Sequence, residues 1–167
     1  GFRQLRIKCN EPTLGWDHLK KMLELVDRTD FFILETNGIL IDHDIKLAKQ
    51  LSRFRNLHVR VSLKGTNREE FARLTGANPE GFDIQLKTLE NLLDAGVSFH
   101  PVVMLSFSKP ASYERLKQNL RIIHESLPHS IEKEYVILYP PVVEQLKKRK
   151  LLLKLHLSQK KLMKVYI

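Results

Sequence analysis

The sequence predicts an α/β fold, a partial (β/α) barrel of about five parallel strands. The first observation behind this prediction is that strand-like and helix-like segments alternate along the chain, which favours parallel strands joined by right-handed crossovers. The second is that polar residues gather near the carboxyl ends of the strands, where α/β barrels build their sites. The alternation alone fits a doubly wound sheet equally well. No glycine-rich phosphate loop follows a strand, which argues against a dinucleotide or nucleoside triphosphate site.

Five strands are expected from alternating or strongly β-prone runs. In the first run, apolar residues and Cys9 alternate with polar residues. The second run is closed by the turn pair Asn37-Gly38, and the fourth contains Pro101, which has no backbone donor. The predicted strands span residues 2–9, 31–38, 57–65, 97–105 and 134–139.

Helices are expected between these strands. Apolar residues at helical spacing follow Pro12 and Thr13, and Asp42 is expected to start the next helix. A longer helix over residues 80–95 ends at Gly96, a residue typical of helix C-termini. Further helices are predicted over residues 69–75 and 112–126, before the pair Pro140-Pro141 and a basic tail.

The length of 167 residues suits one domain with a substantial core. The net charge of +9 is unevenly spread, because residues 142–167 hold eight of the 28 basic residues but one of the 19 acidic residues. We therefore expect a partial barrel over residues 1–141 and a basic C-terminal extension over residues 142–167. The leucines of the extension fit both a strand period and a helix period, so its structure stays open.

Several classes of protein and site are not expected. No apolar run reaches the roughly 18 residues that cross a bilayer, and no signal peptide is recognisable, so a membrane partner is not expected and the cytoplasm is the expected location. The single cysteine, Cys9, cannot form an internal disulfide or by itself hold a zinc or iron–sulfur site. The seven histidines include no His-x-His or His-Glu-x-x-His pair, so no metal site is expected within the chain.

The third predicted strand has one polar face. Its alternation places His58, Arg60, Ser62 and Lys64 together, opposite a face of leucines and valines. Parallel strands are normally covered on both sides. A polar face therefore implies either a strand at the edge of the sheet or a hydrated barrel lumen, and the strand alone does not decide between them.

Other predicted strands also carry polar groups at or near their carboxyl ends. Glu11 follows the first strand, Glu35 lies on the second, and Ser62 and Lys64 end the third. His100 lies within the fourth strand. Acid, base and hydroxyl groups gathered at one rim favour a binding or catalytic site there.

Three stretches in this order resemble the radical S-adenosylmethionine (radical SAM) family, most closely the branch of pyruvate formate-lyase activating enzyme. "RIKCNEPTLGW" is similar to the family's strand ending in Gly-Gly-Glu-Pro, and "LETNG" to its Glu-Thr-Asn-Gly turn. The third stretch, "VRVSLKGTNREEFARLTGANPEGFDIQLKTLENLLDAGV", resembles a family segment with a lysine on the strand and a helix ending in Ala-Gly-Val. The match in order and spacing covers roughly residues 3–105.

The resemblance implies a site for S-adenosylmethionine. Glu11 would accept a charge-assisted hydrogen bond from the amino group of the cofactor's methionine. Glu35, Ser62 and Lys64 would orient the methionine carboxylate and the ribose, and residues near Val103 would lie close to the adenine. The implied cofactor-binding residues are Asn10, Glu11, Glu35, Ser62, Lys64, His100 and Val103; no catalytic residue is assigned.

Two departures from the family pattern accompany the resemblance. Cys9 and Asn10 stand where relatives carry Gly-Gly, which in the family lets the backbone approach the ligand closely. The three-cysteine C-x-x-x-C-x-x-C motif, which holds a 4Fe-4S cluster, is absent from the chain. We therefore expect that the chain begins at a truncation point, with the first βα unit and the cluster ligands upstream.

The expected function is accordingly that of a fragment of a radical SAM enzyme. The complete enzyme would reductively cleave S-adenosylmethionine at the 4Fe-4S cluster and abstract hydrogen from a substrate, a protein substrate such as a glycyl-radical protein included. One alternative is a non-catalytic α/β domain that binds RNA through basic residues 147–164. Another is an ordinary barrel enzyme that uses Glu35 and Lys64 as an acid/base pair.

Overall fold

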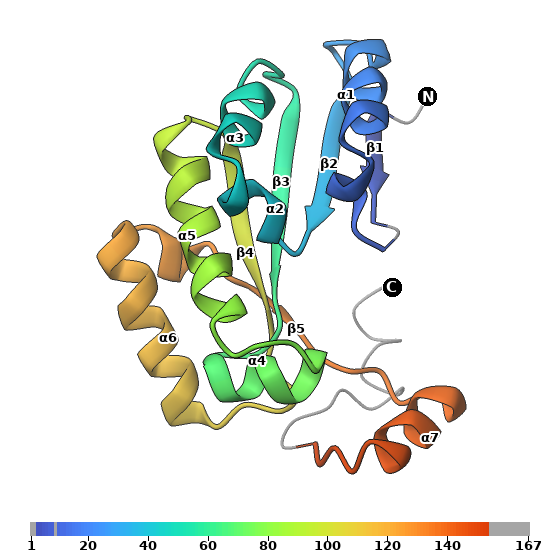
Figure 1. Ribbon diagram of the computed structural model, residues 1–167, viewed down its shortest axis with the longest axis vertical. Coiled ribbons are helices and arrows are strands. Elements are labelled where there is room, and N and C mark those ends of the chain that lie inside the picture. The colour runs from blue at the N-terminus through green and yellow to red at the C-terminus, as the bar shows by residue number, and fades with distance from the viewer. Residues whose placement is uncertain (1–2, 9, 154–167) are drawn as a thin grey trace.

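The computed structural model describes residues 3–8 and 10–153. Five parallel strands form one half-barrel sheet in the order β1-β2-β3-β4-β5 (Figure 1). The strands are β1 (Gln4–Ile7), β2 (Phe31–Thr36), β3 (Leu57–Leu63), β4 (Ser98–Met104) and β5 (Glu132–Glu134). The α/β half-barrel predicted from the sequence is therefore confirmed.

The sequential strand order distinguishes a barrel from a doubly wound sheet. In a doubly wound sheet the strand order reverses, and helices cover both faces. Here each strand pairs with the next strand along the chain, so right-handed crossovers leave the connecting helices on one face. In Figure 1, α1 lies along β1 and α5 beside β4, α6 lies to the left of the strands, and α7 stands apart from the sheet.

The described residues form seven α-helices and two short 3₁₀ turns. They are η1 (Pro12–Gly15), α1 (Trp16–Leu25), α2 (Ile39–His43), α3 (Ile45–Leu51), α4 (Arg68–Thr75), α5 (Gly81–Asp94), α6 (Pro110–Ile123), η2 (Leu127–His129) and α7 (Pro140–Lys148). Asn67 caps α4 by accepting a hydrogen bond from the Glu70 amide, and Gly76 ends the helix in the left-handed conformation.

Two predicted elements differ from the structure. The helix expected to start at Asp42 is two helices, α2 and α3, because Asp44 is extended and its side chain accepts a hydrogen bond from the Lys46 amide. The last strand lies at Glu132–Glu134 rather than at residues 134–139, because its pairing with β4 ends where β4 ends. Within the predicted basic extension, α7 covers the beginning, while residues 154–167 lie outside the described residues.

The hydrophobic core lies between the sheet and the helices. On β3, Leu57, Val59, Val61 and Leu63 are at most 2% exposed and belong to this core. Leucines of α5 and α6 cover them from the other side. The chain thus buries one face of its sheet, and the polar residues of β3 occupy the opposite, inner face. None of the helices within residues 3–8 and 10–153 has the length and hydropathy of a membrane span.

Candidate functional site

The polar face of β3 lines the inside of the half-barrel. β3 is hydrogen-bonded to β2 on one side and to β4 on the other, so the edge-strand interpretation is wrong. The register aligns Glu35, Arg60 and His100 across these three strands. Because paired residues of neighbouring strands point to the same face, their side chains meet inside the half-barrel.

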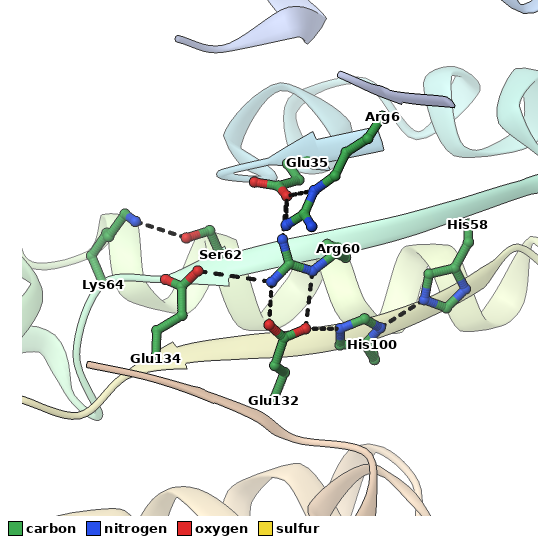
Figure 2. A network of polar contacts seen from close by, with 9 residues as sticks. All are labelled: Arg6, Glu35, His58, Arg60, Ser62, Lys64, His100, Glu132 and Glu134. Carbon is green, nitrogen blue, oxygen red and sulfur yellow. Dashed lines mark hydrogen bonds and ion pairs between the residues drawn. The ribbon is translucent and has the colours of Figure 1, made fainter. Parts of the chain in front are cut away.

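The side chain of Arg60 is the centre of an ionic network on the inner face (Figure 2). Although it is charged, this side chain is only 6% exposed. Its Nε donates to Glu132 Oε2 at 3.0 Å, its Nη2 donates to Glu132 Oε1 at 2.5 Å, and its Nη1 pairs with Glu35. Glu35 also pairs with Arg6, and Glu134 lies 3.8 Å from the Arg60 guanidinium. Every strand except β4 thus contributes a charged side chain.

These partners decide the ionisation of the network. Burial alone would lower the pKa of Arg60, but the hydrogen bond and charge of Glu132, with the charges of Glu35 and Glu134, raise it instead. Burial alone would raise the pKa of Glu132, yet the hydrogen bonds and charges of Arg60 and His100 leave it lowered. The network therefore consists of oppositely charged side chains in contact, and this pairing offsets the cost of burying each charge.

A chain of histidines extends this network towards the amino ends of the strands. Ser98 Oγ lies 2.7 Å from His58 Nδ1, His58 Nε2 lies 2.6 Å from His100 Nδ1, and His100 Nε2 lies 3.0 Å from Glu132. With both rings neutral, each histidine can donate a hydrogen bond through Nε2 and accept one through Nδ1. Each contact in the series from Ser98 to Glu132 then has one donor and one acceptor. Phe31 stacks on the His58 ring at a centroid distance of 5.9 Å.

Acid should destabilise the protein through His58. Burial, followed by the positive charges of His100 and Arg60, lowers the pKa of His58 below its ordinary value of 6.5. Below that value the unfolded chain binds a proton that the folded protein takes up only at lower pH. We therefore expect the free energy of unfolding to fall as the pH drops from about 7 to about 5, measured by urea denaturation. This loss should shrink in His58→Gln and persist in His18→Gln, since His18 is exposed on α1; equal pH dependence in both variants would contradict the assignment.

At the carboxyl ends of the strands, Glu11 ties the first loop to the second strand. Its Oε1 accepts hydrogen bonds from the Thr13 hydroxyl at 2.7 Å and the Thr36 hydroxyl at 2.6 Å. Its Oε2 accepts one from the Asn37 amide at 2.6 Å. Before it, Asn10 has φ = 51°, a left-handed conformation that glycine adopts most easily and asparagine tolerates. Asn10 therefore supplies the backbone geometry of a glycine position; Cys9 lies outside the described residues.

The loops at the carboxyl ends of the strands form the rim of the half-barrel. Two buried side chains tie the remaining loops of this rim together. Gln85 of α5 is fully buried and donates from Nε2 to the carbonyls of Asn37 and Ser62, at 2.7 and 2.9 Å. Glu70 of α4 accepts hydrogen bonds from the Thr66 amide and hydroxyl and from the Ser108 hydroxyl. Glu11, Gln85 and Glu70 together connect the loops that follow the first four strands.

The structure separates the sequence-predicted residues into three places. Asn10, Glu11, Ser62 and Lys64 lie at or beside the rim, where Lys64 Nζ donates to Ser62 Oγ at 2.8 Å. Glu35 and His100 belong to the inner-face network. Val103 has no exposed surface and packs in the core on the opposite face of the sheet. Val102, which is paired with Ser62, takes the inner-face position instead.

Several residues of the inner face and the rim are not marked by any pattern in the sequence. Arg6, Glu132 and Glu134 carry no motif, and no alternation of apolar and polar residues marks Glu132–Glu134 as a strand. In the sequence alone, Gln85 cannot be distinguished from an ordinary polar residue of a helix. Among the residues that the structure describes, no group of three or more His, Cys, Asp or Glu side chains is arranged to hold a metal ion.

Comparison with solved structures supports the half-barrel assignment. anSMEcpe with bound AdoMet and the Kp18Cys peptide is 20% identical, with a TM-score of 0.58 over 78% of this chain and 36% of that chain. Streptococcus suis SuiB bound to S-adenosylmethionine is 16% identical, with a TM-score of 0.59 over 93% of this chain and 37% of that chain. The chain thus spans little more than a third of either protein.

Comparison with known sequences assigns the family. Curated proteins gave no match to the chain. The Radical SAM superfamily model matches residues 3–109, which include β1 to β4, the Glu11 loop, the Arg60 strand and the rim ties. This match covers well over half of the sequence. The chain belongs to the radical SAM superfamily.

Proposed function

We propose that the chain supplies part of the S-adenosylmethionine site of a radical SAM enzyme. The observation that carries this proposal is the pair of opposite charges at the rim, Glu11 and Lys64. Glu11 receives hydrogen bonds from two hydroxyls and two backbone amides, and Lys64 contacts the Ser62 hydroxyl. Within the described part of the chain, neither forms an ion pair.

The two charges match the zwitterionic end of S-adenosylmethionine. The ammonium group of the ligand's methionine requires an anionic acceptor, which Glu11 offers, and its carboxylate requires a cation, which Lys64 offers. Ser62 adds a hydroxyl beside Lys64. Glu35 is already paired with Arg6 and Arg60, so its contribution in this proposal is to hold the inner face beneath the rim.

The residues of this chain fit the methionine end of S-adenosylmethionine but not a 4Fe-4S cluster. A cluster of this kind requires three cysteine thiolates from a radical SAM protein, and the chain contains one cysteine. We therefore assign no cluster ligand and derive no step through the cluster. When bound, S-adenosylmethionine supplies the hydrogen-abstracting chemistry of the superfamily; this chain binds it, orients it and presents the polar inner face beneath it.

A protein or peptide is the substrate class that we favour. anSMEcpe, which shares the half-barrel, was solved with a bound peptide. Activation of a glycyl-radical protein is the finer form of this proposal, and it rests on the ordered resemblance of the three sequence stretches to the activating-enzyme branch.

The reading frame upstream of Gly1 tests the proposal. We expect a C-x-x-x-C-x-x-C motif within about one βα unit, on the order of 30 residues. The longer protein, reconstituted anaerobically with iron and sulfide, should then form 5′-deoxyadenosine from S-adenosylmethionine in the presence of a reductant. A Glu11→Gln, Lys64→Met double variant should lose this product while an exposed control, His18→Gln, keeps it. Lack of product from the reconstituted wild-type protein would refute the proposed function.

The 167-residue chain alone should bind S-adenosylmethionine weakly and show no enzymatic activity. Without cluster ligands, the remaining contacts are charged groups at an open rim, each worth about 1 kcal/mol or less. We expect S-adenosylmethionine to bind with a dissociation constant no better than about 1 mM, and no 5′-deoxyadenosine to form with iron, sulfide and reductant. Calorimetry and product analysis check both expectations. Tight binding, or product formed by this chain, would contradict the missing-cluster argument.

A further inference from the structure

A buried amide of helix α5 joins the two strand ends that carry the rim. Gln85 lies on α5 with no exposed surface. Its Nε2 has two hydrogens, and one goes to the Asn37 carbonyl after β2 while the other goes to the Ser62 carbonyl on β3. Its Oε1 faces the Lys64 amide at 3.4 Å. The three polar atoms around this one side chain therefore belong to backbone positions in or next to the rim.

The Asn37 peptide group couples this amide to Glu11. Its carbonyl accepts from Gln85, while its N–H donates to Glu11 Oε2 at 2.6 Å. One turn further along α5, the Thr88 hydroxyl donates to the Gly38 carbonyl at 2.6 Å, which holds the same loop a second time. The position of the Glu11 carboxylate relative to Lys64 is thus set through Asn37 and Gln85.

A fully satisfied buried amide fixes geometry because each lost contact leaves a buried carbonyl without a partner. Methionine at position 85 would fill the space without a donor. Glutamate would place a second oxygen against two carbonyl oxygens. Neither replacement can restore the spacing between the end of β2 and the end of β3.

We propose that Gln85 is a positioning residue, which sets the gap between the Glu11 and Lys64 sides of the S-adenosylmethionine site without touching the ligand. This proposal rests on the proposed function. It predicts that loss of the Gln85 donors weakens binding far more than an equally destabilising change elsewhere on α5 does.

The test uses the ¹⁵N-labelled 167-residue chain and S-adenosylhomocysteine, which undergoes no radical chemistry. At concentrations far below saturation, the slope of an amide shift against ligand concentration varies inversely with the dissociation constant. We expect the slopes at Asn37, Ser62 and Lys64 to fall at least tenfold in Gln85→Met. Asn91→Leu is the matched control, because Asn91 is a buried amide of the same helix, 4% exposed, that contacts Asp42 rather than a strand end.

Each outcome separates the two proposals. Equal slopes in wild type and Gln85→Met overturn the positioning role and leave the proposed function standing. Slopes that fall equally in Gln85→Met and Asn91→Leu also overturn it, because general destabilisation then explains the loss. Absence of any shift at the rim of the wild-type chain, together with absence of product from the longer reconstituted protein, refutes the proposed function and the positioning role with it.

A measurement on the wild-type chain covers the case in which Gln85→Met does not fold. The side-chain amide protons of Gln85 should shift and exchange more slowly with solvent when S-adenosylhomocysteine binds, because the ligand tightens the loops that they hold. Rim amides that shift while the Gln85 side-chain signals and their exchange stay unchanged would overturn the proposal without any variant.

Discussion

Replacing Arg60 with methionine should lower the free energy of unfolding by about 3 kcal/mol, because the change removes the cation on which Glu35 and Glu132 converge. Methionine fills much of the same volume, so the loss reflects charge rather than a cavity. The Glu132 side chain is 46% exposed, which places the expected value at the lower end of the range for broken buried pairs. Urea denaturation with an unchanged m-value measures it.

Arg68→Met is the matched control for Arg60→Met. Arg68 forms an ion pair with Asp83 at 2.7 Å, but the two side chains are 59% and 44% exposed. The loss of Arg68 should lower the free energy of unfolding far less than the loss of Arg60 does, because solvent screens an exposed ion pair. Adding Glu132→Gln to Arg60→Met should restore part of the stability, since it removes an uncompensated carboxylate. Equal losses in the two single variants would show that burial of Arg60 does not make its pairs exceptional.

Replacing Gly65 with alanine should destabilise the protein by about 3 kcal/mol from two causes. Gly65 has φ = 103°, a conformation that residues with a Cβ rarely adopt. An added Cβ would also lie 2.6 Å from the Cβ of Glu70, which must then move. Because Glu70 ties the loops after β3 and β4, thermal and urea unfolding should both register the change.

Gly76→Ala separates the two causes. Gly76 also has a positive φ, 76°, but an added Cβ there meets no atom within 4 Å. Gly76→Ala should lower the free energy of unfolding by about 1 kcal/mol, which is the contribution of the backbone strain alone. If Gly65→Ala costs no more than Gly76→Ala, the close contact with Glu70 is relieved without loss.

The sequence predicted the strands wherever the alternation of apolar and polar residues followed the sheet. The first and third strands obey it, because one face packs on helices while the other does not, whereas the second and fourth strands are marked by strongly β-prone apolar residues. For the fifth strand, the apolar run after Glu134 predicts residues 134–139, whereas the structure has the charged segment Glu132–Glu134 in the sheet. Those charges form a strand because Arg60 and β4 lie beside them, and no local pattern contains that information.

The candidate site could likewise be predicted only where a local pattern in the sequence marks its residues. The polar face of β3 and the Glu11 loop were visible in the sequence, because each is a local pattern. The pairing of Arg60 with Glu35 and Glu132 depends on the register between strands, and the role of Gln85 depends on how α5 lies over them. Both are tertiary relations between residues far apart in sequence.

The ties at the rim have a consequence for the order of folding. Glu11 reaches Asn37 across 26 positions, Gln85 reaches the same residue across 48, and Glu70 reaches Ser108 across 38. Contacts of such separation form late, because the loops that they close must be ordered first. Helix α5 has to dock on a nearly complete sheet before the strand ends acquire their final spacing. If the rim binds the proposed ligand, its binding geometry would therefore be completed in the last stage of folding and would be the first feature lost when α5 loosens.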